Sequence, residues 1–184
     1  MLFIVQKAIS CNFMHETMAF CVEISNFATH FFYHHTMKTA LFTGTFDPFT
    51  IGHQSIVDRT INLFDRLVIA VAVSKLKHTD EQVEQRVRAI ADIYRDEPRV
   101  VVKAYSDLTI DMAKREGAQY LIRGVRNVKD YEYERTQADF NRKFGSIETI
   151  LVFAEPGLEH VSSTLVRELK SFGRDVTDFL PKKD

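Results

Sequence analysis

The sequence predicts an α/β fold in which a five-stranded parallel β-sheet carries helices on both faces. Apolar runs of strand length alternate with segments whose apolar residues recur at helical spacing, five times over from residue 38 onward. Residues 67–73 (LVIAVAV) are apolar almost throughout, as expected for a parallel strand that is buried on both faces. The chain has 184 residues, of which 45% are hydrophobic and 27% charged. This size and composition are typical of one globular domain with its own core.

The predicted elements follow one another in a regular order. The strands are residues 39–43, 67–73, 100–104, 120–122 and 148–153. Two apolar stripes at helical spacing lie between them, formed by Ile56, Val57, Ile61 and Phe64 and by Val83, Val87, Ile90 and Tyr94. Residues 130–144 also have a helical pattern but are polar on nearly every side, which predicts either a solvated helix or one that faces a ligand or another subunit. Because strand–helix–strand units connect in the right-handed sense, we predict a Rossmann-like sheet that binds ligands at the carboxyl ends of its strands.

The first 36 residues differ in composition from the rest of the chain. They contain both cysteines, four of the seven histidines and six of the fifteen phenylalanines, but no Gly, Pro, Asp or Arg. Since Met37 is followed at once by a strand pattern, we interpret residues 1–36 as an N-terminal extension that is disordered or results from a start codon placed too early, and residues 37–184 as the functional domain. An amphipathic arm that docks on a surface or membrane is the alternative. The histidines within residues 30–35 lack regular ligand spacing and are not expected to bind metal.

Charge and cysteine content limit the partners of the protein. Lys and Arg total 24 against 25 for Asp and Glu, which argues against a general nucleic-acid-binding protein, because such proteins carry a marked basic excess. Two cysteines are too few for a disulfide framework. No apolar run reaches the roughly 18 residues that a membrane span needs. We therefore expect a cytoplasmic protein with neither a nucleic-acid nor a membrane partner.

The loop after the first predicted strand is a candidate for phosphate chemistry. It has the sequence GTFDPFTIGH and leads into a helix. Gly44 and Gly52 allow close approach of the backbone, and Pro48 fixes a turn, so N–H groups near the helix start can meet a phosphate. His53 stands at the positive end of that helix. The loop matches neither the P-loop nor the dinucleotide-binding pattern, and taken alone it is also compatible with a purely structural turn.

Donors and cations follow three further strands. They are Ser74, Lys75, Lys77 and His78 after the second strand, Arg123, Gly124, Val125 and Arg126 after the fourth, and the run VSSTLVR, residues 161–167, after the fifth. Each group has a structural explanation, as a solvated loop, a strand exit or an N-cap of the last helix by Ser162 or Ser163. Because parallel strands end at one edge of the sheet, the groups together predict convergence on a single polyanion.

These motifs in combination resemble the phosphopantetheine adenylyltransferase family of the nucleotidyltransferase superfamily. The resemblance rests on GTFDPFTIGH, IRGVR, YEYE and VSSTLVRE and runs from about Met37 to the C-terminus. Many members of the superfamily have His in the first place of an H-x-G-H motif, where this chain has Thr50. That substitution fits the phosphopantetheine branch better than the cytidylyltransferase branch.

The resemblance implies a role for each matching residue. The residues that bind the triphosphate and the reacting phosphoryl group would be Thr45, His53, Lys77 and Arg126. The nucleotide would be bound by Thr45, Phe46, His53, Gly124, Val125, Arg126, Glu134, Leu158, Glu159, His160, Val161, Ser162, Ser163 and Thr164. The acceptor would contact Thr45, Lys77, Thr109 and Arg123. A structural ion pair with a nearby helical cation is the alternative role for Glu134.

The reaction that the resemblance implies is adenylyl transfer from ATP to 4′-phosphopantetheine, giving dephospho-coenzyme A and pyrophosphate. The acceptor brings its own phosphate oxygen as the nucleophile, so no Ser-His-Asp or Cys-His arrangement is needed, and catalysis would come from alignment and charge stabilisation. Mg²⁺ would accompany ATP through the phosphate oxygens, with no metal ligands from the protein, because the sequence shows no dense cluster of carboxylates. Family members commonly form hexamers, so a homohexamer is implied.

Two other functions stay open at this point. The first is an adenylyl- or cytidylyltransferase of the same fold that acts on nicotinamide mononucleotide or a polyol phosphate, which Thr50 and the VSSTLVRE run disfavour. The second is a non-catalytic regulator that only binds a nucleotide, since fold alone does not determine function. The presence of both His53 and Lys77 argues against the regulator.

Overall fold

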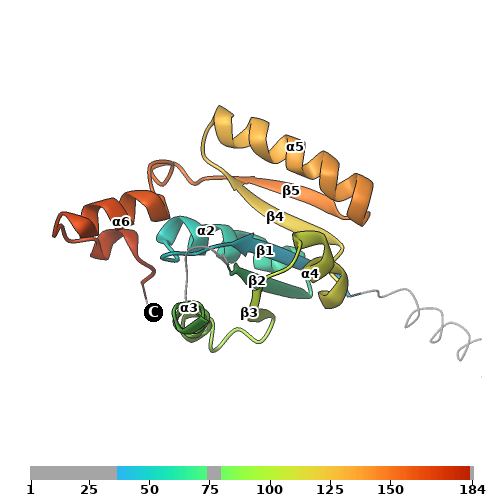
Figure 1. Cartoon of the computed structure of the whole chain (residues 1–184), viewed down its shortest axis with the longest axis horizontal. Helices are drawn as coiled ribbons and strands as arrows, with labels where there is room; N and C mark the ends of the chain where they lie inside the picture. Colours follow the sequence, from blue (N-terminus) through green and yellow to red (C-terminus); the bar gives the residue numbers. More distant parts are fainter. Residues whose placement is uncertain (1–36, 74–79, 183–184) are drawn as a thin grey trace, which may run out of the picture. The chain divides into compact units, whose positions relative to one another are not determined.

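The computed structural model describes residues 37–73 and 80–182, which form a parallel sheet flanked by helices (Figure 1). The strands are β1 (Thr39–Gly44), β2 (Arg66–Ala72), β3 (Val100–Tyr105), β4 (Tyr120–Val125) and β5 (Glu148–Phe153). The helices are α2 (Ile51–Thr60), α3 (Asp80–Ile93), α4 (Thr109–Glu116), α5 (Val128–Gly145) and α6 (Ser163–Ser171), with the 3₁₀ helices η1 (Ile61–Leu63) and η2 (Thr177–Phe179). All five predicted strands are therefore confirmed, and the predicted helix over residues 130–144 corresponds to α5.

The fourth strand is longer than the sequence pattern suggests. The sequence pattern predicts a strand over residues 120–122 with Arg123 and Gly124 in the loop after it, but β4 continues to Val125. The reason is pairing with β5, in which Arg123 lies opposite Leu151 and Val125 opposite Phe153. Because backbone hydrogen bonds from the neighbouring strand stabilise this segment, the polar Arg123 stays in the sheet and projects from its surface rather than from a flexible loop.

The strand order of the sheet is β3-β2-β1-β4-β5, and every neighbouring pair is parallel. From β1 the chain builds outward through β2 to β3, then returns to the other side of β1 with β4 and continues to β5. The direction of winding reverses between β1 and β4. In open sheets of this type the crevice outside that reversal point is where ligands bind.

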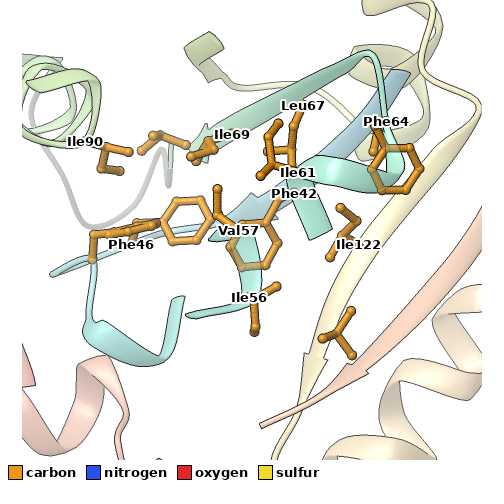
Figure 2. Packing of buried hydrophobic residues seen from close by; sticks show 14 of the residues in the cluster. Phe42, Phe46, Ile56, Val57, Ile61, Phe64, Leu67, Ile69, Ile90 and Ile122 are labelled. Atoms are coloured by element: carbon orange, nitrogen blue, oxygen red, sulfur yellow. The ribbon is translucent and has the colours of Figure 1, made fainter. Parts of the chain in front are cut away.

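Both faces of the sheet are buried, which confirms the predicted layers. The side chains of β1 alternate: Phe42 packs on one face with α2 and α3 residues such as Val57 and Ile90 (Figure 2). Leu41 packs on the opposite face with Met112 of α4 and with further buried residues. Helix α5 packs against β4 and β5. The predicted apolar stripes of α2 and α3 therefore form core contacts, as their helical spacing indicates.

The described residues belong to one compact unit, Met37–Asp184. None of the helices in residues 37–73 and 80–182 has the length and apolar character needed to cross a bilayer. The prediction for residues 1–36 and the roles predicted for Lys75, Lys77 and His78 lie outside the described residues.

Candidate active site

Two adjoining cavities, each of about 390 Å³, open at the carboxyl ends of β1 and β4. The β1–α2 loop, the end of β4 and the residues that lead into α6 line the first cavity. The second lies between the ends of β2 and β3, the start of α4 and one face of α5. Thr45 and Arg123 border both cavities. Two ligands bound one in each cavity would therefore meet beside these two residues.

The β1–α2 loop is fixed by aromatic packing below it. Phe46 is only 2% exposed, and its ring lies against those of Phe42 and Phe49 at centroid distances of 5.2 and 5.4 Å. A Cβ on Gly44 would come within 2.9 Å of the Phe46 ring, so this close approach requires glycine. Phe46 thus borders the first cavity mainly as part of its floor, while the neighbouring Thr45 remains exposed.

His53 lies in the first turn of α2 and lines the first cavity. Its Nδ1 accepts a hydrogen bond from the backbone N–H of Thr50 at 3.0 Å and lies 3.0 Å from the Thr50 hydroxyl. A nitrogen that accepts a backbone N–H carries no proton in the neutral ring, so the proton is on Nε2. The ring also contacts Phe46 and Phe49, at centroid distances of 5.1 and 5.3 Å. His53 is therefore a partly buried helix residue and not a free loop side chain.

The surroundings of His53 keep it neutral. Burial and, to a smaller extent, the positive charges of Arg126 and Arg123 together lower its pKa from 6.5 to about 4. At neutral pH the imidazole is uncharged, with Nε2–H as its donor. A neutral donor at the N-terminus of a helix can hydrogen-bond a phosphate oxygen without taking up a proton first.

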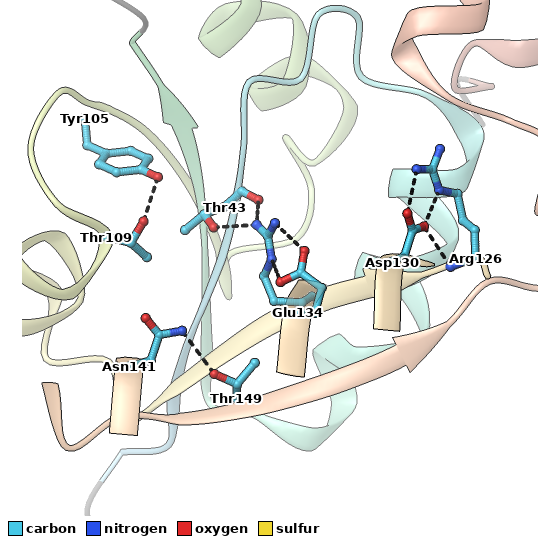
Figure 3. A network of polar contacts seen from close by, with 9 residues as sticks. Thr43, Tyr105, Thr109, Arg126, Asp130, Glu134, Asn141 and Thr149 are labelled. Atoms are coloured by element: carbon cyan, nitrogen blue, oxygen red, sulfur yellow. Dashed lines mark hydrogen bonds and ion pairs between the residues drawn. The ribbon is translucent and has the colours of Figure 1, made fainter. Parts of the chain in front are cut away.

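Arg123 and the buried Glu134 form a partly buried ion pair that borders both cavities (Figure 3). Nε and Nη2 of Arg123 donate to the two carboxylate oxygens of Glu134 at 2.8 and 2.6 Å, and Nη1 donates to the carbonyl and hydroxyl oxygens of Thr43 at 2.7 and 2.9 Å. Burial acts against the charge of Arg123, yet its hydrogen bonds and attraction to Glu134 raise its pKa. The alternative role of Glu134 is an ion pair with a helical cation; the ion pair exists, but its partner Arg123 is on the strand β4. The guanidinium is consequently held in one orientation.

Arg126 stands just beyond the end of β4, at the start of α5. Its Nε and its backbone N–H both donate to Asp130, at 2.8 and 3.1 Å. Asn127 caps α5 by accepting the backbone N–H of Asp130 at 3.0 Å. Burial opposes the charge of Asp130, but the bonds from Arg126 hold the pKa of this carboxyl below its usual value. The capped helix start therefore keeps Arg126 at the edge of the first cavity.

The start of α6 lies beside the start of α2. Ser162 caps α6 by accepting the backbone N–H of Leu165 at 3.1 Å, as its position in the sequence suggests. The hydroxyl of Ser163 donates to the carbonyl of Pro48 at 2.9 Å, and a Cβ on Gly52 would lie 3.9 Å from Val161. Two helix N-termini thus border the same cavity, and both favour a negatively charged ligand.

The chain matches the family described as Cytidylyltransferase-like over residues 41–169. It is 52% identical over 146 residues to the phosphopantetheine adenylyltransferase of Bacteroides fragilis, which covers 79% of this chain and 97% of that protein. It is 47% identical over 143 residues to the phosphopantetheine adenylyltransferase of Porphyromonas gingivalis, covering 78% and 94% of the two chains. The chain belongs to the phosphopantetheine adenylyltransferase family.

The solved structure of a protein from Vibrio parahaemolyticus, described as a putative nicotinate-nucleotide adenylyltransferase, has the same fold. Its TM-score is 0.60 at 14% sequence identity, and the match covers 80% of this chain and 88% of that one. The architecture predicted from the sequence is thereby confirmed by an independent solved structure.

Most residues that the family resemblance selects lie together in the structure. The first cavity is lined by Thr45, Phe46, His53, Arg123, Gly124, Val125, Arg126, Glu134, Leu158, Val161, Ser162, Ser163 and Thr164. Glu159 and His160 are not among its lining residues: Glu159 accepts the backbone N–H of Gly157 at 2.8 Å, and the His160 ring faces Phe179 at 6.2 Å. These two residues bend away from the cavity because the turn before α6 directs its buried residue, Val161, inward.

The second cavity is lined by Thr109, which the resemblance assigns to the acceptor, and by polar residues that sequence reasoning missed. The hydroxyl of Tyr105 lies 3.1 Å from that of Thr109. Asn141 is buried, and its amide donates to Thr149 at 3.3 Å (Figure 3). The available signal was the spacing of Glu134, Gln137 and Asn141, three polar residues three and four positions apart that share one face of a helix. In the phosphopantetheine adenylyltransferase fold of this chain, that face of α5 is the wall of the second cavity.

Proposed function

We propose that this protein transfers the adenylyl group of ATP to 4′-phosphopantetheine, with dephospho-coenzyme A and pyrophosphate as products. The observation that carries the proposal is the pair of cavities that join at Thr45 and Arg123. An enzyme that joins two phosphorylated substrates needs one compartment for each and a cationic junction where the phosphates meet. The names of the relatives, which are 52% and 47% identical, supply the identity of the two substrates.

The first cavity suits the nucleotide. It collects the N-termini of α2 and α6 and the side chains of His53 and Arg126, all of which favour negative charge. The second cavity suits the acceptor. Its polar residues Thr109 and Asn141 offer hydrogen-bond partners to a chain of amides and hydroxyls. The Arg123 guanidinium, held by Glu134 and Thr43, borders the end of the cavity where the acceptor phosphate would lie.

Catalysis in this arrangement is alignment and charge stabilisation. A phosphate oxygen of the acceptor attacks the α-phosphorus of ATP, a new oxygen–phosphorus bond forms, and the bond from the α-phosphorus to the bridging oxygen breaks, with pyrophosphate leaving. Thr45 and Arg123 hold the attacking phosphate, while Nε2–H of His53 and the guanidinium of Arg126 stabilise charge on the transferring group. No protein side chain is required to form a covalent bond.

Mg²⁺ is the ion that we propose to enter with ATP. Within residues 37–73 and 80–182 no group of three or more His, Cys, Asp or Glu side chains is arranged to hold a metal. The two carboxylates that border the first cavity, Asp130 and Glu134, are hydrogen-bonded to arginines. The residues present therefore fit an ion that is carried mainly by phosphate oxygens and water, both of which Mg²⁺ commonly keeps as ligands. When bound there, the ion would neutralise charge on the leaving pyrophosphate.

We also propose a homohexamer in the cytoplasm. The support for assembly is the group of large exposed side chains on α5, among them Tyr131, Phe140 and Phe144. Two cysteines in 184 residues support a reducing compartment. Light scattering of the purified chain tests the homohexamer, because a mass well below that of six subunits would contradict it. Fractionation of the source cells tests the cytoplasmic location.

The first experiment measures pyrophosphate release from ATP and Mg²⁺, with and without 4′-phosphopantetheine. Release that depends on the acceptor supports the proposed function. If the folded protein binds ATP but releases nothing, the same assay with nicotinamide mononucleotide or a polyol phosphate, and with CTP in place of ATP, tests the other transferases. Binding of ATP without release for any acceptor would instead indicate a regulatory protein.

Two variants of His53 test its role in the same assay. His53→Gln places an amide N–H near the position of Nε2, whereas His53→Asn places an acceptor near Nδ1 and removes the donor. We expect His53→Asn to lower kcat by about 10²- to 10³-fold, the usual effect of losing one donor to a developing charge, and His53→Gln to retain more activity. Because His53 also packs in an aromatic cluster, both variants are first checked for folding by circular dichroism. Equal activity of the wild type and folded His53→Asn would refute the role.

A further inference from the structure

The β1–α2 loop is held from outside at three of its backbone carbonyls. The carbonyl of Thr45 accepts a hydrogen bond from Nη1 of Arg86 at 2.5 Å, that of Asp47 accepts one from Arg167, and that of Pro48 accepts one from the hydroxyl of Ser163 at 2.9 Å. Arg86 belongs to α3, whereas the other two donors belong to α6. The loop that borders the first cavity is therefore fixed by two helices that are distant in sequence.

Arg86 contacts the loop at Thr45, next to the residue with the least common backbone conformation in the loop. Thr45 is exposed and borders both cavities. The next residue, Phe46, has φ 47°, in the left-handed region that residues other than glycine seldom adopt. Such a backbone conformation persists only where the surroundings impose it. Arg86 supplies part of that constraint, because its bond fixes the carbonyl of the peptide that joins Thr45 to Phe46.

Arg86 is itself anchored, and one of its nitrogens is not satisfied. Its Nε donates to the carbonyl of Gln82 one turn earlier in α3, at 3.1 Å, which orients the guanidinium toward the loop. Its Nη2 is buried and has no hydrogen-bond partner among the side-chain and backbone atoms that the structure describes. A buried donor without an acceptor is unfavourable, more so when it is charged. A residue that served packing alone would not require this cationic group.

We propose that Arg86 is a positioning residue for adenylyl transfer. It acts through Thr45, which it holds at the junction where the two substrates meet, and it does not line either cavity itself. This inference rests on the proposed function. Loss of the bond should displace Thr45 and misalign the attacking phosphate, which lowers the rate of transfer more than the affinity for ATP.

The test compares Arg86→Ala with Arg88→Ala in the full chain. Arg88 lies on the same helix, but its side chain is 77% exposed and pairs with Glu84, four positions earlier, at 3.0 Å, so Arg88→Ala removes an arginine from α3 without removing a contact to the loop. Steady-state pyrophosphate release gives kcat, calorimetric titration gives the Kd for ATP, and thermal unfolding gives the stability of each variant. A further assay adds guanidinium ion to Arg86→Ala, since a small cation can enter the space left by the side chain.

We expect Arg86→Ala to lower kcat by about 10- to 100-fold, as for displacement of a reacting group by about 1 Å, with the Kd for ATP changed less than threefold and partial recovery in guanidinium. Arg88→Ala should match the wild type. A decrease in kcat of less than fivefold, or one accompanied by an equal loss of ATP binding, would overturn the inference. If Arg86→Ala does not fold, Arg86→Gln decides by the same criteria. Failure of the wild type to turn over would instead refute the proposed function, so the two failures are distinguishable.

Discussion

The neutral state of His53 predicts a specific dependence of stability on pH. In the folded protein its pKa is about 4, against 6.5 for an unperturbed histidine, chiefly because the ring is buried. Between these two values the unfolded chain binds a proton that the folded protein does not, so acidification through this window favours unfolding. The stability in question is fully present above pH 6.5 and is lost as the pH falls toward 4. At about 1.36 kcal/mol for each unit of pKa shift, the loss amounts to roughly 3 kcal/mol.

Urea unfolding of the wild type and of His53→Gln, at several pH values between 7 and 4.5, measures this effect. Glutamine does not titrate, so the variant lacks the contribution of residue 53, while the other groups contribute equally to both proteins. The chain has no Trp, so far-ultraviolet circular dichroism follows the transition. We expect the free energy of unfolding of the wild type to fall faster than that of the variant, by up to about 1.4 kcal/mol per pH unit. Parallel curves for the two proteins would show that His53 titrates normally and would refute the neutral-donor argument.

Three further substitutions test separate parts of the site. Glu134→Gln removes the charge that orients Arg123. Because the Arg123 side chain is 28% exposed, we expect a loss of stability of about 1–3 kcal/mol, below the range for a fully buried ion pair, and a higher KM for the acceptor. Chemical denaturation and steady-state kinetics measure the two effects, and an unchanged KM in the folded variant would contradict the assignment. In Gly124→Ala the new Cβ would lie 2.5 Å from Cδ1 of Ile56, so the free energy of unfolding should fall by about 1–3 kcal/mol. Ile56→Val in the same chain removes Cδ1 and should recover part of that free energy. If it recovers none, the contact with Ile56 is not the cause of the loss. Ser162→Ala removes the N-cap of α6 and should lower the free energy of unfolding by about 1 kcal/mol. We also expect weaker ATP binding, which calorimetric titration measures. A variant as stable as the wild type would mean that the cap is dispensable.

The interior of the fold follows from local sequence patterns. Residues 67–73 carry no polar interruption, and such a run is stable only as a strand covered on both faces, which β2 is. The stripe that includes Val57 has the spacing of a helix with one buried side, and Val57 is fully buried. These patterns are visible in the sequence because each depends on residues that are neighbours along one element.

The position of the site also follows from the sequence, but its contacts do not. Parallel strands end at one edge, so the loops after β1, β4 and β5 had to converge, and the cavities lie where they meet. Residue spacing could not show that Arg123 would pair with Glu134, since that pair depends on how α5 packs across β4. It also could not show that Glu159 turns away from the cavity while Ser162 faces it.

The layers of the sheet and its helices, the edge that carries the chemistry and the family of the protein can all be inferred from the sequence alone. The tertiary structure decided which charges neutralise one another, which proton His53 keeps, and which distant arginine, Arg86, fixes the loop beside Thr45. The difference arises because the interactions act between residues at different separations along the chain. Hydrophobic periodicity acts over a few neighbouring residues. The contacts of Arg123 with Glu134, of Arg86 with Thr45 and of Arg123 with Thr43 join residues that are 11, 41 and 80 positions apart, and they exist only after the elements have packed.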